Sequence, residues 1–151
     1  VRLFRIAPIE SIDEAHAMVR RAETILEPHR KAILSLSKPE TWVGVGGTFT
    51  TTAALAQGVH WNDRKRIHGY PLTREAVLRT METLAATPLP ERLTIPGLQP
   101  QRADIIVHGL AILLCCMQSL GIAEITVSEY GNLEGYLTWK YLSDTRSTSV
   151  G

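Results

Sequence analysis

The chain has 151 residues, of which 44% are hydrophobic and 21% are charged, and its formal net charge is +1. A chain of this length fits one folded domain with a single core, and its composition excludes the polar, charge-rich class of disordered segments. A net charge this small gives no broad field that would attract nucleic acid, so we expect no DNA partner, and any anion must be held by local chemistry.

The first predicted elements are a short strand and a helix. Arg2 to Ala7 is predicted to form the strand, which Pro8 closes. Ser11 then opens the helix with the capping-box spacing Ser11-x-x-Glu14, in which each side chain satisfies a free backbone N–H at the helix start. The apolar stripe of this helix reaches Pro28, where we expect the helix to end, kink or restart.

A glycine-rich turn follows the next strand. Trp42 to Val45 is predicted to be a brief strand, and Thr48 to Gln57 a helix that stops at Gly58. Gly46 and Gly47 lie between these two elements. Glycine lets a ligand approach the backbone closely, and the free N–H groups and dipole of a helix start favour an anion. The residues alone support equally an anion site and a tight turn packed under its neighbours.

The middle of the chain contains a basic loop and an amphipathic helix. His60 to Tyr70 is polar and carries a cluster of basic side chains, which is typical of a solvated loop, and contact with a ligand is the alternative interpretation. Thr73 is predicted to cap a helix with one apolar face. The side chains of that face are Val77, Leu78, Met81 and Leu84.

Arg102 and Asp104 stand at the start of the most apolar segment. Ala103 to Leu120 is apolar on nearly all sides, which predicts the central buried helix. The negative charge of Asp104 would interact favourably with the positive dipole end at the start of that helix. Arg102 can present a fork of hydrogen-bond donors to a phosphate. The alternative is a surface ion pair of little energetic worth, and the two residues taken alone favour it.

This segment does not have the features of a membrane span. Its longest apolar run, Ile105 to Met117, is interrupted by His108 and Gly109 and is shorter than the about 20 residues that a bilayer requires. Cys115 and Cys116 are adjacent, so on a helix they point about 100° apart, which suits neither a disulfide nor a metal pair. We therefore expect no membrane partner and a cytoplasmic protein with reduced core thiols.

A strand and a helix complete an alternating pattern. Glu124 to Ser128 alternates like a strand, Leu133 to Leu142 is predicted to be the last helix, and residues 143–151 are expected to form a flexible tail. Strands separated by helices predict an α/β architecture. In such sheets ligands collect at the carboxyl ends of strands, where the next helix begins, and this rule points to Gly46 and Gly47.

Five stretches of the chain carry a resemblance to a known family. In order they are "VRL", "GVGGTFTTTAAL", "GYPLT", "ERLTIPGLQPQRADIIVHGLAIL" and "ITVSEYGNLEGYL". Together they resemble the second half of the exopolyphosphatase/guanosine pentaphosphate phosphatase family, from about Val1 to Leu137. The resemblance implies a ribonuclease-H-like second lobe of the actin-like ATPase superfamily, truncated before its third strand, with residues 1–142 as the partial lobe.

The resemblance also implies a site and a reaction. Gly46, Gly47 and Thr48 would face the cleft between two lobes, and Arg102 matches a family arginine associated with binding polyphosphate or guanosine polyphosphate. The complete enzyme would hydrolyse the terminal phosphoanhydride with a divalent metal, expected to be magnesium. The phosphate loops and the catalytic carboxylate of the family have no counterpart here, so we expect no catalytic residue in this chain, an inactive fragment, and a missing N-terminal lobe as its partner. Glu129 does not match the catalytic carboxylate and is interpreted as structural.

Two other functions remain open from the sequence: a nucleotide-binding or kinase-like member of the same superfamily, and a non-catalytic assembly module. The resemblance implies that two further strands of the family's sheet lie between Arg2 to Ala7 and Trp42 to Val45. Their absence would leave strand edges uncovered, and exposed edges recruit partners. We therefore expect a homo-oligomer, or the segment "VRLFRI" as a substitute strand beside "WVGVG".

Overall fold

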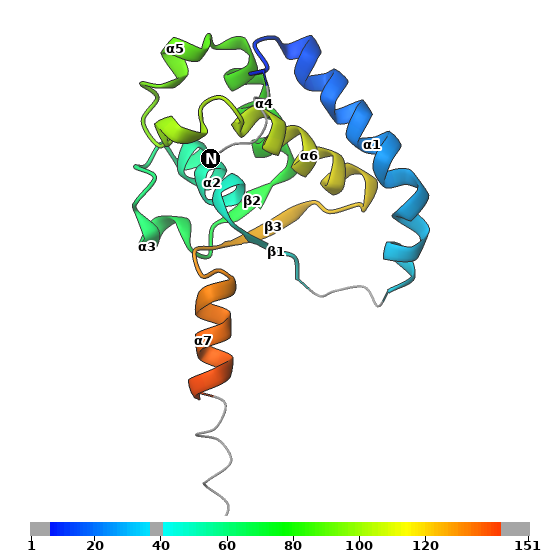
Figure 1. Cartoon of the computed structure of the whole chain (residues 1–151), viewed down its shortest axis with the longest axis vertical. Helices are drawn as coiled ribbons and strands as arrows, with labels where there is room; N and C mark the ends of the chain where they lie inside the picture. The colour runs from blue at the N-terminus through cyan, green and yellow to red at the C-terminus, as the bar shows by residue number, and fades with distance from the viewer. Residues whose placement is uncertain (1–6, 37–40, 143–151) are drawn as a thin grey trace, which may run out of the picture.

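The computed structural model describes residues 7–36 and 41–142. Helices alternate with short strands along the chain, which confirms the predicted α/β pattern (Figure 1). The elements are α1 (Ile12–Ser35), β1 (Val43–Val45), α2 (Gly47–Gln57), α3 (Arg64–Ile67), β2 (Pro71–Thr73), α4 (Arg74–Ala86), α5 (Leu89–Arg92), the 3-10 helix η1 (Pro100–Arg102), α6 (Ile106–Ser119), β3 (Glu124–Ser128) and α7 (Asn132–Leu142). Except for Ala7, the predicted strand at Arg2 to Ala7 lies outside the described residues, as does the tail at 143–151.

Helix α1 begins as predicted and is longer than predicted. The backbone N–H of Glu14 donates to Oγ of Ser11 at 3.2 Å, and Oε2 of Glu14 accepts from the N–H of Glu10 at 3.1 Å. The helix then continues through Pro28 to Ser35, so two of the outcomes expected there, an end and a restart, are wrong. Pro28 is exposed, so water can bond the carbonyl that its missing N–H leaves free, and the helix tolerates it.

The three strands form one mixed sheet in the order β1-β3-β2. β1 and β3 run parallel, with Gly44 opposite Val127, and β2 pairs antiparallel with β3, with Leu72 opposite Ile125. β1 was predicted as a brief apolar run of strand length, and β3 was predicted from its alternation. β2 was not, because it has three residues and begins with Pro71, which cannot donate a hydrogen bond to a ladder.

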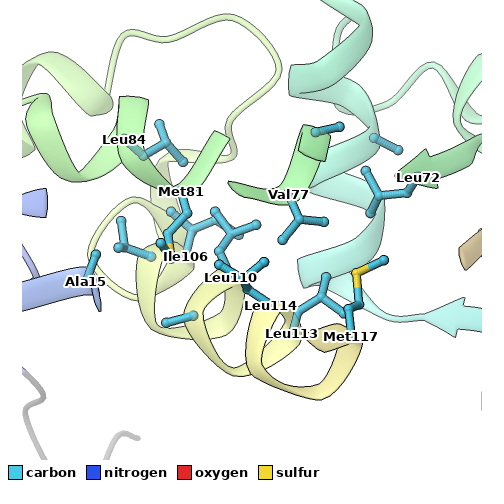
Figure 2. Packing of buried hydrophobic residues seen from close by; sticks show 14 of the residues in the cluster. Ala15, Leu72, Val77, Met81, Leu84, Ile106, Leu110, Leu113, Leu114 and Met117 are labelled. Carbon is cyan, nitrogen blue, oxygen red and sulfur yellow. The ribbon is translucent and has the colours of Figure 1, made fainter. Parts of the chain in front are cut away.

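The core lies between α6, the sheet and the helices around them. α6 packs against α1 and α4, which confirms it as the central buried helix. Figure 2 shows the side chains of α4 and α6 meeting in this core. Fully or almost fully buried members include Val77, Met81, Leu84, Ile106, Leu110, Leu114 and Met117. Within the described residues, no helix combines the length and apolar character needed to cross a bilayer.

One buried charge was not predicted. Arg92, at the end of α5, is fully buried. Its Nε donates to the carbonyl of Thr87 at 2.7 Å, and its Nη2 donates to the carbonyl of Ile9. The carboxylate of Glu10 makes a further link, because it accepts from the N–H of Leu89 at 3.0 Å. The hydrogen bonds of Arg92 and Glu10 connect the segment before α1 to α5 and to the connection between α4 and α5.

We expect the chain to lose stability as the pH falls below about 6.5. Burial lowers the pKa of His108, the charge of Asp104 opposes this effect, and the charge of Arg92 adds to it. A histidine with a lowered pKa in the fold is held neutral there, so proton binding favours the unfolded chain. The stability that neutral His108 contributes is therefore fully present above its pKa in the unfolded chain, about 6.5. This stability is lost as the pH falls from there through the lower pKa of His108 in the fold.

Urea unfolding at a series of pH values between about 8 and 5 measures this effect. His108→Gln should flatten the pH dependence below about 6.5. His29→Gln, at an exposed position of α1, is the matched control and should leave the profile unchanged. An identical profile for His108→Gln and the unchanged chain would contradict the assignment.

Candidate functional site

The turn between β1 and α2 places a helix start at the carboxyl end of a strand. Gly46 precedes α2 with φ at 102°, a value that glycine adopts without strain, and it has no side chain to cap the helix. Its carbonyl accepts from the N–H of Thr50 at 3.2 Å. The first N–H groups of any helix lack an intrahelical partner, and they carry the positive end of the helix dipole. This geometry is the predicted one for holding an anion.

Arg102 lies directly on this turn. A Cβ on Gly47 would overlap the guanidinium carbon and both terminal nitrogens of Arg102, so the guanidinium packs on the α-carbon of Gly47. The Nε of Arg102 donates to Oε1 of Gln99 at 2.8 Å, which orients the guanidinium plane. The structure thus brings together four residues predicted from the sequence, Gly46, Gly47, Thr48 and Arg102, which we call the phosphate-site candidates.

Thr48, in the first turn of α2, packs closely against α6. A Cβ on Gly109 would come within 2.7 Å of the Thr48 hydroxyl oxygen, so the bare backbone of α6 permits this close approach. Gly44 likewise permits a close side-chain contact, because a Cβ on Gly44 would overlap the ring of Phe49. Gly44 and Gly109 therefore have packing roles. Phosphate binding by Thr48 stays a prediction.

A second polar cluster lies after β3, beside the basic loop. The Nε of Arg64 lies 3.3 Å from Oε2 of Glu129, and the backbone N–H of Glu129 donates to Nδ1 of His68 at 3.3 Å. Ile67 is fully buried and anchors α3, so the segment predicted as a solvated loop is partly packed. The sequence signals for this cluster were the basic residues of the loop and a glutamate at a strand end. They were not combined because the contact joins segments that are distant in the chain.

The described residues do not fit a resident metal ion. Across residues 7–36 and 41–142, no three His, Cys, Asp or Glu side chains lie close enough to share a cation. Burial raises the pKa of both Cys115 and Cys116, which keeps them as thiols and makes them poor metal ligands. Magnesium stays a prediction for the complete enzyme, and no chemical step is assigned to a metal held by this chain.

Comparison with known proteins identifies relatives of the chain. The model of the Ppx/GppA phosphatase family matches residues 8–143. Exopolyphosphatase 2 of Mycobacterium tuberculosis is 30% identical over 131 residues, which are 84% of this chain and 40% of that protein. A bifunctional 3-dehydroquinate synthase/phosphatase of Fusobacterium nucleatum is 31% identical over 110 residues, 73% of this chain and 15% of that protein. The chain thus spans less than half the length of each of these relatives.

Solved structures agree with the sequence comparison. The Ppx/GppA family member of Aquifex aeolicus superposes with a TM-score of 0.72 at 31% identity, covering 83% of this chain and 41% of that one. An exopolyphosphatase of Cytophaga hutchinsonii gives a TM-score of 0.72 at 26% identity, covering 93% and 45%. These similarities and the small mixed sheet are compatible with an actin-like fold.

Proposed function

Because the chain belongs to the Ppx/GppA phosphatase family, we propose that it is part of a phosphohydrolase that releases the terminal phosphate of inorganic polyphosphate or guanosine pentaphosphate. The observation that carries the proposal is the contact of Arg102 with Gly47 at the start of α2. The chain would form part of a ribonuclease-H-like second lobe, with this turn facing the cleft between the lobes.

The phosphate-site candidates would bind substrate rather than break its bond. Backbone N–H groups at the start of α2 and the guanidinium of Arg102 would hold nonbridging phosphate oxygens. In the reaction a water oxygen bonds to the terminal phosphorus, the bridging P–O bond breaks, and a base takes the proton of the water. Glu129 follows β3 at the same sheet edge as this turn, but it is already paired with Arg64. We therefore propose that a first lobe supplies the base.

A phosphate-release assay tests this function. The 151-residue chain alone is expected to hydrolyse neither polyphosphate nor guanosine pentaphosphate, because the proposed base is absent from it. A chimera in which the chain replaces the matched segment of the Mycobacterium tuberculosis relative is expected to release phosphate. Circular dichroism controls for its folding. Turnover by the chain alone, abolished by a substitution within it, would refute the proposed division of roles, and a folded but inactive chimera would refute the function.

We also propose that the isolated chain forms a homo-oligomer. β1 is an edge strand among the described residues, and its Val43 and Val45 are 60% and 43% exposed. Apolar edge strands recruit another chain. Light scattering across a range of concentrations should give a mass above that of one chain, and Val43→Lys with Val45→Lys should shift it toward the monomer. Leu34→Lys on α1 is the control, and a monomer at every concentration would contradict the proposal.

A further inference from the structure

A cavity of about 240 Å³ lies between α3 and the loop that follows β3. Its walls are formed by Arg64, Lys65, His68, Glu129 and Tyr130, and we call it the α3 pocket. None of these residues belongs to the phosphate-site candidates. The α3 pocket therefore offers binding chemistry that the proposed hydrolysis does not use.

Polar contacts fix two of the wall residues. Because the backbone N–H of Glu129 donates to Nδ1 of His68, Nδ1 carries no proton and Nε2 is the N–H donor of the ring. The side chain of Glu129 is only 15% exposed and is held by Arg64 through Oε2. The pocket thus has a donor on His68 and a carboxylate acceptor on Glu129 in defined positions.

Tyr130 adds an exposed aromatic surface to the pocket. The residue is 58% exposed, and the edge contact with the His68 ring has a centroid distance of 4.8 Å and an angle of 75° between the planes. The Cζ of Arg64 lies 6.0 Å from the centre of the Tyr130 ring. Nucleic-acid bases stack on such aromatic faces, and arginine adds a cation–π contribution.

The wall of the pocket carries one net positive charge, because Arg64 and Lys65 are positive and Glu129 is negative. Glu134 of α7 adds a negative charge near Arg64, and hydrogen bonds from the backbone N–H groups of Glu134 and Gly131, together with the charge of Arg64, lower its pKa. A pocket with so small a net charge has little attraction for a polyanion. Its ring and hydrogen-bonding groups suit a neutral heterocycle instead.

The α3 pocket and the start of α2 lie at the same edge of the sheet. Val45 at the end of β1 is opposite Ser128 at the end of β3, and neighbouring strands lie about 4.8 Å apart. Gly46 follows the first strand and Glu129 follows the second. A ligand with its phosphates at Gly46 can therefore extend its other end toward the pocket.

We propose that the α3 pocket binds the guanine base of a nucleotide whose phosphate chain lies at the start of α2. The base stacks on Tyr130, the carboxylate of Glu129 accepts from its N1–H and N2 amino groups, and Nε2 of His68 donates to a ring acceptor. Guanine places two donors side by side on this edge, whereas adenine has only its N6 amino group there. The assignment rests on the proposed function, within which it selects guanosine polyphosphate over inorganic polyphosphate.

Calorimetric titration of the 151-residue chain with GTP, ATP and inorganic tripolyphosphate tests the pocket. GTP is expected to bind roughly 5- to 100-fold more tightly than tripolyphosphate, the effect of stacking one base on an aromatic ring. Tyr130→Ala should remove this advantage, and Glu129→Gln should remove the preference for GTP over ATP. Both variants should keep their affinity for tripolyphosphate. Tyr136→Ala, at an exposed tyrosine of α7, is the control and should change nothing.

Nuclear magnetic resonance shifts locate the base independently of affinity. The GTP and tripolyphosphate complexes should differ at residues 64–68 and 129–130. Absence of GTP binding, equal affinity for GTP and tripolyphosphate, or differences confined to other residues would overturn the base site. If tripolyphosphate still bound and lost affinity in Arg102→Ala, the proposed function would survive that result. Tripolyphosphate binding that did not depend on Arg102 would instead count against the phosphate site itself.

Discussion

Replacing Arg92 with methionine is expected to lower the free energy of unfolding by about 2–4 kcal/mol. Hydrogen bonds to charged groups contribute roughly 1.5–3 kcal/mol each, and Arg92 donates to two backbone carbonyls, those of Thr87 and Ile9. Methionine fills similar space but leaves both carbonyls without this donor. The buried Nη1 has no hydrogen-bond partner among the described residues, and burial lowers the pKa of Arg92, so removing the charge recovers part of the loss.

Thermal and urea unfolding measure the effect, which corresponds to roughly 10 °C in Tm for a domain of this size. Arg79→Met, at an exposed position of α4, is the matched control and should change stability by less than about 0.5 kcal/mol. If Arg92→Met were as stable as this control, the two carbonyls would not depend on Arg92, and its part in fastening the segment before α1 would be refuted.

The elements predicted correctly are those with local causes. The Ser11 cap and the Gly58 stop depend on residues within one helical turn, and the all-round apolar character of α6 reports its burial directly. The continuation of α1 through Pro28 was missed because it depends on the exposure of that face. β2 was missed because three residues carry too little pattern, and only the neighbouring strand makes them a strand.

The candidate site also combines a feature with a local cause and contacts between residues that are distant in the sequence. The glycine turn is a local strand-to-helix signal, and a general rule for α/β sheets drew attention to it. The contact of Arg102 with Gly47 could not be predicted from spacing, since it depends on how η1 packs against α2. Phosphate binding by Arg102 stays a prediction. Residues alone even favoured a surface ion pair for it, and the family resemblance reversed that reading. The contacts of Arg92 with Ile9 and of Arg64 with Glu129 were missed because each joins segments far apart in the sequence.

Removing the guanidinium of Arg102 is expected to weaken tripolyphosphate binding roughly 10- to 100-fold without unfolding the chain. A charged hydrogen bond to phosphate contributes about 1.5–3 kcal/mol, and each 1.4 kcal/mol is a factor of ten in affinity. The loss of the bond to Gln99 should cost about 1 kcal/mol of stability or less. Calorimetry and thermal unfolding of Arg102→Ala measure both quantities. Unchanged affinity would return Arg102 to a structural role.

Gly47→Ala tests the same contact without removing any charge. The added methyl group would occupy the space of the Arg102 guanidinium, whose flexible side chain can swing away, while alanine is a better helix former than glycine. Stability should therefore hold or rise while tripolyphosphate affinity falls about tenfold. Gly135→Ala on α7, where a Cβ meets open space, is the control. If the methyl group acts by displacing Arg102, Gly47→Ala should have little further effect in an Arg102→Ala background, because the two residues share one interaction. Additive losses would mean instead that the methyl group blocks the phosphate from the backbone N–H groups directly.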